Sequence, residues 1–400
     1  MQRVFERVGQ AAGLIAADGS FTSTIFEEMS ALANQHGALN LGQGFPDTDG
    51  PTAMLDAAAQ ALATGVNQYA TIAGIPALRQ AVATHQVRFY GLDLDPDTQV
   101  TVTAGASEAL AASIAALVEP GEEVILFEPY YDLYPAVAAL AGARVRTVPL
   151  VPPTFEPDLD ALEAAFSERT ALVVVNDPHN PTGAVFSLEA KQKIADLATR
   201  YGAVILADEV YEHMVYSGPY QPIQALPGAA ERTLAVSAIS KTHSATGWRV
   251  GWVTGPADLV AAVRLVKGYL THSAAAPLQA AAAVGVGLGD SFYEGLHRQY
   301  AHQRQVLLDG LAGTPWQPVA PDGTFFAVAD VRQVMQEHGF ESARHLCQAL
   351  PESAGVALIP LSAFVTDGYR PAVDSWVRFA FCKRPEVLQE ATTRLRAFSG

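Results

Sequence analysis

The sequence contains little cysteine for a chain of 400 residues. Cys347 and Cys382 are the only two, and they lie in unrelated contexts without a CxxC pair or a Cys/His cluster of metal-binding spacing. This scarcity argues against a disulfide framework and against a zinc site of recognisable spacing. We therefore expect a reducing, cytoplasmic environment and no metal.

Positive charge is also scarce. The chain has 25 Lys and Arg residues against 41 Asp and Glu residues, which gives a formal net charge of −16. Such an acidic balance argues against nucleic acid or an anionic membrane surface as a partner. It does not argue against a small anionic substrate, because a few arginines placed in one site decide that binding locally.

Long apolar runs are missing as well. The N-terminus mixes charged and small residues and shows no hydrophobic segment of a secretory signal. Residues 268–289 carry no charged side chain, but they are mostly Ala and Gly with His, Ser and Gln. That composition is not hydrophobic enough for a membrane span and predicts a packed helix.

From residue 99 onward, apolar strand-like runs alternate with helix-like segments. The strands are expected at 99–103, 123–127, 144–150, 171–176, 203–207, 233–238 and 249–254. This alternation predicts an α/β fold with a mostly parallel sheet sandwiched by helices. In such sheets, ligands bind beyond the carboxyl ends of the strands.

The chain is longer than one hydrophobic core usually supports, so we expect two domains. After a helical stretch at 256–311, strand-like runs and helices mix in a way that is typical of a smaller α+β domain. We expect an N-terminal arm (1–45) that contributes to the small domain, a large domain (46–295) and a small C-terminal domain (296–400).

One lysine stands between two of the predicted strands. Lys241 lies within SAISKTHSATGWRVGW (237–252), at the end of an apolar run and among small neighbours. A lysine held in such surroundings is a candidate for a lowered pKa and for amine nucleophilicity. Taken alone, it is better explained as a solvated loop residue, since most lysines are exposed.

Polar side chains also follow other predicted strands. Ser107, after Gly105 and Ala106, opens a helix and is either part of an anion site or an ordinary helix cap. Asn180 lies in DPHNPTG, which is either a tight loop or a turn that aims an amide at a ligand.

Two charged residues belong to strands themselves. Asp208 follows the run AVILA, where a buried carboxylate is unfavourable without a cation; the alternative interpretation is a cap of the next segment. Arg378 lies in SWVRFAF, and its guanidinium suits a carboxylate or phosphate ligand as well as an internal ion pair.

A lysine, an anion, an amide, a phenol and an anion-binding turn at successive strand ends suit pyridoxal phosphate chemistry. The chain resembles the fold-type I, class I/II aminotransferases over essentially its whole length. The resemblance is carried, in the family's order, by HNPTG (179–183), DEVYEH (208–213), SKTHSATGWRVGW (240–252) and VRFAFCKR (377–384).

Two further motifs narrow the resemblance. LGQGFPDTDGP and EPYYDLYP are similar to the kynurenine, glutamine and methionine aminotransferase branch, and most similar to N-succinyldiaminopimelate aminotransferases of actinobacterial type. The resemblance implies an amino-group transfer between an amino acid and a 2-oxo acid with ping-pong kinetics.

The resemblance also implies roles for individual residues. Those that would act on the cofactor ring are Lys241 as Schiff-base lysine and acid–base, Asp208 at the pyridine nitrogen, Asn180 and Tyr211 at the ring oxygen, and Tyr131 stacked on the ring. Those that would bind anions are Gly105, Ala106, Ser107 and Arg249 for the phosphate, Tyr69 for the phosphate of a neighbouring subunit in a homodimer, and Arg378 for the substrate carboxylate. Gly44 would line the substrate, with Asn180 beside it.

One position departs from the family. Many relatives carry a hydroxyl three residues before the lysine, where this chain has Ala238, and either Ser237 or Ser240 would replace it. A doubly acidic substrate would need further cations, for which Arg370, His243 and a residue of the partner subunit are open candidates. Two other functions also stay open: a C–S β-lyase, and a cofactor-binding regulatory protein without catalysis.

Overall fold

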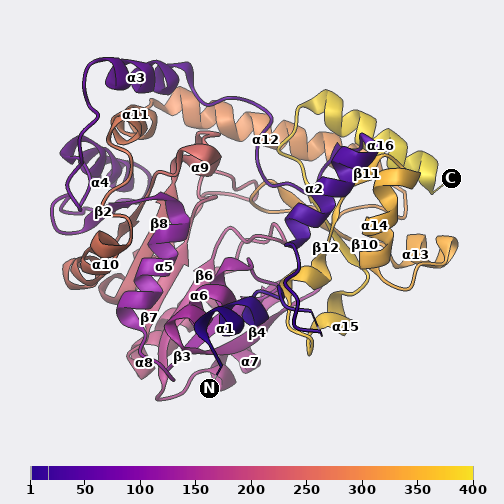
Figure 1. The fold of residues 1–400 in the computed structure, drawn as a ribbon, viewed down its shortest axis with the longest axis horizontal. Coiled ribbons are helices and arrows are strands. Elements are labelled where there is room, and N and C mark those ends of the chain that lie inside the picture. Colours follow the sequence, from indigo (N-terminus) through magenta and orange to yellow (C-terminus); the bar gives the residue numbers. More distant parts are fainter. Residues whose placement is uncertain (1, 17, 400) are drawn as a thin grey trace.

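The structure is a computed structural model that describes residues 2–16 and 18–399 (Figure 1). Its centre is an eight-stranded sheet. In spatial order the strands are β2 (Val100–Thr103), β9 (Gly251–Thr254), β8 (Thr233–Ala238), β7 (Val204–Asp208), β6 (Thr170–Asn176), β3 (Glu123–Glu128), β4 (Arg144–Val151) and β5 (Glu156–Pro157).

The pairs that join β8, β7, β6, β3 and β4 are all parallel, whereas β9 runs antiparallel to both β8 and β2. The predicted mostly parallel sheet is therefore confirmed. The antiparallel β9 arises because the chain turns back directly after Lys241 instead of crossing over through a long helix.

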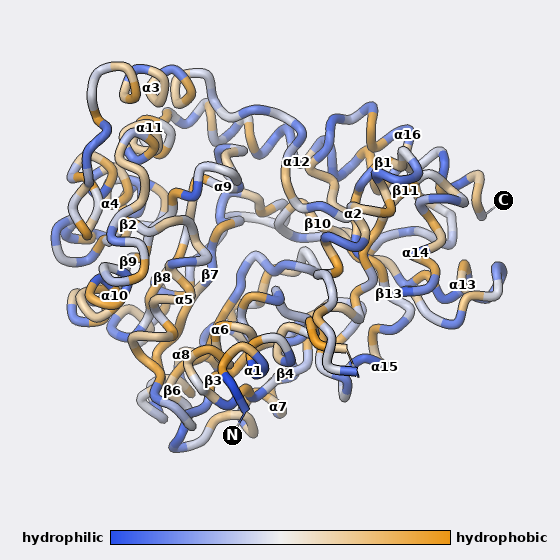
Figure 2. The backbone as a smooth tube through the Cα atoms, viewed as in Figure 1, coloured by the Kyte–Doolittle hydropathy of each residue, from blue (hydrophilic) through white to orange (hydrophobic). Residues whose placement is uncertain are grey.

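Helices cover both faces of the sheet, which explains why its strands are almost continuously apolar (Figures 1 and 2). Alternate residues of the central strands enter two separate cores. Leu206 of β7 packs with residues of α5 (Gly105–Leu117), α6 (Leu133–Ala141) and α10 (Ala257–Leu270), whereas Ile205 packs with residues of α7 (Leu159–Ala165) and α8 (Leu188–Tyr201). The helices of this large part are α3 (Thr52–Ala63), α4 (Pro76–Tyr90), α5 (Gly105–Leu117), α6 (Leu133–Ala141), α7 (Leu159–Ala165), α8 (Leu188–Tyr201), α9 (Ile239–Thr242), α10 (Ala257–Leu270), α11 (Ala276–Val286) and α12 (Asp290–Leu311).

A smaller α+β part lies beside the large one. Its three-stranded sheet has the order β10–β13–β12, and a second, two-stranded sheet pairs β1 with β11 in parallel. Its elements are α2 (Ile25–His36), β1 (Leu39–Asn40), β10 (Phe326–Asp330), α13 (Arg332–His338), α14 (Ala343–Ser353), β11 (Val356–Ala357), β12 (Ile359–Pro360), α15 (Arg370–Val373), β13 (Trp376–Ala380) and α16 (Pro385–Phe398).

The N-terminal arm touches both parts. Helix α1 (Val4–Ala11) packs against α6, whereas α2 packs against α14 and β1 pairs with β11. The predicted boundary at residue 295 falls inside α12, which runs from the large part toward the small one (Figure 1). No linker marks that position, and we retain the division at 295 only as a proposal.

One predicted element is wrong. Residues 268–289 do not form a single helix, because α10 ends at Leu270 and α11 begins at Ala276. His272 lies between them with φ +63°, a left-handed conformation that interrupts a helix. Within the described residues, no helix combines the length and the hydropathy needed to cross a membrane.

Candidate active site

A cavity of about 340 Å³ lies at the carboxyl ends of the parallel strands. Most of the residues singled out in the sequence line it together, although they come from distant segments. They are Gly44, Ala106, Ser107, Tyr131, Asn180, Asp208, Tyr211, Ser240, Lys241, Arg249 and Arg378. Gly105 and Tyr69 do not line the cavity, but Gly105 lies close to the Arg249 guanidinium.

Lys241 belongs to the short helix α9, which follows β8 without a loop. Its Nζ donates a hydrogen bond to the carbonyl oxygen of Gly44 at 3.1 Å and lies 5.6 Å from the ring centre of Tyr211. Burial lowers the pKa of Lys241 to about 8, even though the negative charge of Asp208 opposes that shift. The interpretation of Lys241 as a solvated loop residue is therefore wrong.

Asp208 is the last residue of β7, and its Oδ2 accepts a hydrogen bond from the hydroxyl of Tyr134 at 2.7 Å. Burial raises the pKa of Asp208 to about 6, against the opposing effects of the Tyr134 hydroxyl and the Lys241 charge. No cation of the described residues lies within ion-pairing distance of this carboxylate. It is thus available to a cationic group of a ligand.

A chain of hydrogen bonds connects Asp208 with the small part of the molecule. The amide of Asn176 donates to the backbone oxygen of Asp208 at 3.0 Å and accepts from the backbone N–H of Asn180 at 2.8 Å. Arg378 then donates through Nη1 to Oδ1 of Asn180 at 3.0 Å. Asn180 therefore occupies a defined position between the two parts, beyond what a tight loop alone requires.

Arg378 is only 1% exposed, and burial lowers its pKa to about 10. Its Nη2 donates to the carbonyl oxygen of Gly42 at 2.6 Å, its guanidinium lies 4.2 Å from the ring centre of Phe326, and its Nε has no hydrogen-bond partner. None of the described carboxylates forms an ion pair with it. The alternative of an internal ion pair is wrong, and a buried cation with an unused donor remains for a ligand anion.

Gly105 and Arg249 make a second anion-binding corner. Gly105 has φ +79°, and a Cβ atom on it would lie 2.5 Å from Nη2 of Arg249, so only glycine leaves room for the guanidinium. Arg249 donates to the Thr246 carbonyl oxygen at 3.0 Å and to the Ser107 hydroxyl at 3.2 Å. Together with the N-terminus of α5, the guanidinium suits a phosphate.

Two alternatives left by the sequence are resolved here. Ser107 is the third residue of α5, not its cap. Ser237 donates to Oε1 of Glu212 at 2.6 Å and is absent from the cavity lining, whereas Ser240 lines the cavity. Of the two serines near Ala238, only Ser240 is in a position to contact a ligand.

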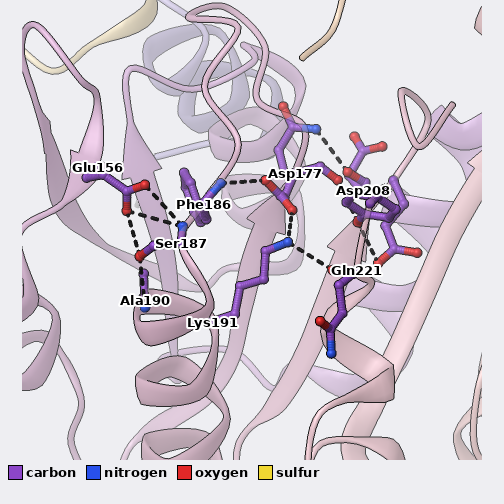
Figure 3. Close-up of polar contacts among 11 residues, drawn as sticks. Glu156, Asp177, Phe186, Ser187, Ala190, Lys191, Asp208 and Gln221 are labelled. Carbon is purple, nitrogen blue, oxygen red and sulfur yellow. Dashed lines mark hydrogen bonds and ion pairs between the residues drawn. The ribbon is translucent and has the colours of Figure 1, made fainter. Parts of the chain in front are cut away.

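The loop that carries Asn180 is held from below by a buried ion pair (Figure 3). Nζ of Lys191, on α8, lies 2.5 Å from Oδ2 of Asp177 and donates to the carbonyl oxygen of Gln221 at 2.9 Å. Oδ1 of Asp177 accepts from the backbone N–H of Phe186 at 2.8 Å. Both ends of the 177–186 loop are thereby fixed to one carboxylate.

Sequence reasoning missed several residues that line the cavity, and three of them contact the predicted site residues. Tyr134 holds Asp208, Asn176 connects it with Asn180, and Phe326 lies against Arg378. Asn176 ends a buried strand just as Asp208 does, so its position was a usable signal. Tyr134 and Phe326 occur in ordinary apolar contexts, and no local pattern distinguishes them from core residues.

Comparisons with known proteins agree with this geometry. Residues 37–395 match the sequence profile of the family described as aminotransferase class I and II. The chain belongs to that family. It is an aminotransferase, and the members of its family depend on pyridoxal phosphate.

Among its relatives is a probable N-succinyldiaminopimelate aminotransferase, DapC, of Mycobacterium tuberculosis, which is 45% identical over 94% of this chain and 96% of its own. The methionine aminotransferase of Escherichia coli is 41% identical over 94% and 95% of the two chains. The solved structure of the Mycobacterium tuberculosis N-succinyldiaminopimelate aminotransferase superposes with a TM-score of 0.90, covering 94% of this chain and 97% of that one. These likenesses confirm the predicted family branch.

Proposed function

We propose that this aminotransferase binds pyridoxal phosphate in the 340 Å³ cavity and transfers an amino group from an amino acid to a 2-oxo acid by a ping-pong mechanism. The observation that carries the proposal is the pairing, within one cavity, of a partly buried Lys241 of lowered pKa with an Asp208 carboxylate that lacks a cation. A basic amine and an uncompensated anion are the groups that this chemistry requires.

The residues fit the cofactor at three points. Asp208 would hold the protonated ring nitrogen, Arg249 with the Gly105 turn and Ser107 would hold the phosphate, and Asn180 with Tyr211 would face the ring oxygen. Tyr131 would cover a face of the ring. When bound, pyridoxal phosphate supplies an electron sink for the electron pair released at the substrate Cα.

The protein's own contribution is proton transfer and orientation. The neutral Nζ of Lys241 would accept the proton from the substrate Cα and return it during transfer, while the Gly44 carbonyl oxygen holds Nζ in place. Arg378 would bind the α-carboxylate, which supplies an acceptor for its unused Nε.

Replacing the lysine tests the proposal directly. Lys241→Ala should lower the turnover rate by at least about 10²–10⁴-fold, the usual contribution of acid–base catalysis, and abolish the visible absorbance that depends on the covalent bond between Lys241 and the cofactor. Full transaminase activity in this variant would refute the assignment. Lys193→Ala, a change of a partly exposed lysine on α8, is the matched control.

For the amino donor, we propose N-succinyldiaminopimelate, on the likeness to the 45% identical relative. The cations that line the cavity are Lys241, Arg249 and Arg378, and each already has a proposed role. Arg370 instead pairs with Asp367 at 2.6 Å, and His243 packs against Phe292 outside the cavity lining. A cation that binds the carboxylates at the far end of N-succinyldiaminopimelate would therefore come from a partner subunit.

Methionine or kynurenine is the alternative donor. Phe26, Phe45 and Phe326 give the cavity an aromatic wall, which favours an apolar side chain. A panel of N-succinyldiaminopimelate, methionine, kynurenine and glutamine, compared by kcat/KM, decides between the two. Release of pyruvate and ammonia from a cysteine conjugate without a 2-oxo acid would instead identify a C–S β-lyase.

We further propose a homodimer with shared active sites, working in the cytoplasm. Tyr69 is 89% exposed, although the ring of His272 lies edge-on to it with 5.3 Å between the ring centres. Lys267 of α10 donates to the carbonyl oxygen of Ile72, which places the Tyr69 segment beside α10, where Leu265 and Tyr269 are 65% and 88% exposed. Such an apolar surface is typical of an interface. We call these four residues, Tyr69, Ile72, Leu265 and Tyr269, the α10 surface.

A further inference from the structure

Outside the active-site cavity, two histidines and a glutamate converge on one point. His85 lies on α4, and Glu212 and His213 follow β7. Nε2 of His85 lies 2.7 Å from Nε2 of His213, and all three side chains offer ligand atoms within 4.8 Å of one another. Because 128 residues separate the two histidines, no local spacing in the sequence reveals this group.

The two imidazoles face each other through their Nε2 atoms, an arrangement that two imidazolium cations could not adopt. Burial, with a smaller effect of the Arg88 charge, lowers the pKa of His85 to about 3, and burial likewise holds the pKa of His213 well below its ordinary value. Arg88 itself is bound to Asp290. At most one proton can lie between the facing Nε2 atoms, so at least one lone pair points into the gap.

Glu212 adds a buried carboxylate without a cation. Its Oε1 accepts a hydrogen bond from Ser237, and the hydroxyl of Tyr90, which carries no charge, lies beside the carboxylate. No cation of residues 2–16 and 18–399 forms an ion pair with it. A buried carboxylate is strongly unfavourable in this state, and a bound cation would remove the penalty.

We propose that His85, His213 and Glu212 bind one zinc ion. Two imidazole nitrogens and one carboxylate oxygen form the donor set of zinc sites that keep an open position. Tetrahedral zinc with bonds of 2.0–2.1 Å needs ligand atoms about 3.3 Å apart. The two rings would have to separate by less than about 1 Å from their present distance, and the carboxylate oxygen would move inward.

The surroundings supply the remaining features of such a site. Glu212 and His213 also line a second cavity, of about 430 Å³, from which a water molecule can reach the fourth coordination position. The side-chain amide of Gln86 lies 3.5 Å from Nδ1 of His85, and its Oε1 is buried without a partner. Rotating that amide by 180° would give Nδ1–H an acceptor and leave Nε2 for the metal, the arrangement common among zinc-bound histidines.

The ion would support the active site without entering it. None of the three ligands lines the 340 Å³ cavity. Glu212 and His213 nevertheless follow Asp208 and Tyr211 directly in the chain, and Ser237 connects Glu212 with the strand that leads to Lys241. Zinc would thus hold the segment after β7 against α4 from the outside.

Metal content of the untagged holoenzyme tests the proposal. After treatment with a chelator and equilibration with zinc chloride, we expect one tightly bound zinc per chain and a higher Tm. His85→Gln and Glu212→Gln should each weaken zinc binding by more than about 100-fold, beyond the usual effect of losing a partner of a ligand. His297→Gln is the control, because His297 lines the same cavity but its Nε2 bonds to the Val215 carbonyl oxygen.

Zinc affinity that is unchanged in Glu212→Gln, or absent from the wild-type protein at micromolar zinc, would overturn the proposal. Glu212→Gln retains an oxygen for the Ser237 hydroxyl and nearly the same shape, so it decides the question even if His85→Gln fails to fold. Because zinc is measured as bound metal, the outcome does not depend on the identity of the amino donor.

Discussion

Arg378 donates hydrogen bonds to Asn180 and to the Gly42 carbonyl oxygen, yet its Nε is unused. Arg378→Ala should raise KM for the amino acid about 10- to 150-fold, since hydrogen bonds to charged groups contribute about 1.5–3 kcal/mol. Arg378→Lys keeps the charge but loses the planar fork, and it should recover only part of the affinity. Steady-state kinetics measure both variants, and an unchanged KM in Arg378→Ala would exclude the carboxylate role.

The lowered pKa of Lys241 predicts a pH dependence of cofactor capture. Only the neutral amine attacks an aldehyde, and the fraction of neutral Nζ rises with pH through the pKa of about 8. The rate at which the apoenzyme regains the visible absorbance of bound cofactor should therefore increase from pH 7 to pH 9 and then level off. A midpoint close to 10.5, the ordinary value, would show that burial does not affect this amine.

The turn that leads into helix α5 has room for only a glycine at position 105. Gly105→Ala should weaken cofactor binding, because the new methyl group would lie 2.5 Å from the Arg249 guanidinium. Gly121→Ala is the matched control: its φ of +93° is also left-handed, but nothing lies within 4 Å of the added Cβ. Both changes should cost about 1–2 kcal/mol of stability, whereas only Gly105→Ala should raise the Kd for pyridoxal phosphate. Equal Kd values would disprove the steric role.

Helix α8 contributes one lysine to a buried ion pair and another to a partly exposed ion pair, so the contributions of the two pairs to stability can be compared. Lys191→Met leaves Asp177 buried without a cation and should lower the free energy of unfolding by about 3–5 kcal/mol. Lys193→Met breaks the partly exposed pair with Glu163, and it should cost only about 0–1 kcal/mol. Denaturant unfolding measures both. Similar losses would mean that the Asp177 pair contributes no more than a surface pair.

The elements also show how far the sequence could be interpreted. The carboxyl ends of parallel strands meet at one edge of a sheet, so the positions of Asn180, Asp208 and Lys241 near one another could be predicted. The direction in which a side chain at a strand end faces could not be predicted, because Ser237 and Ser240 looked equivalent in the sequence. The contacts of Tyr134 with Asp208 and of Gly105 with Arg249 depend on side-chain packing between segments more than 70 residues apart.

At the scale of the whole molecule, the α10 surface predicts assembly. Tyr269→Glu would place a charge on the proposed interface, and it should convert the dimer to monomers with weaker cofactor retention, because Tyr69 would then lose the neighbouring phosphate. Leu188→Glu, on α8, alters a residue of 56% exposure outside this surface and should leave the dimer intact. Size-exclusion chromatography with light scattering distinguishes the outcomes, and a wild-type monomer would refute the homodimer.

The hydrogen bond from Arg378 to Gly42 joins residues 336 positions apart. It has a consequence for the order in which the enzyme becomes complete during synthesis. The last strand of the large sheet to be synthesised is β9, which ends at Thr254. In contrast, β1 can pair only after β11 has been made, and the Leu41 carbonyl oxygen can accept its hydrogen bond only after Ala380 has been made. On the ribosome, the part that would hold the cofactor is therefore made well before the part that would hold the substrate carboxylate, and a prematurely released chain has no complete substrate site.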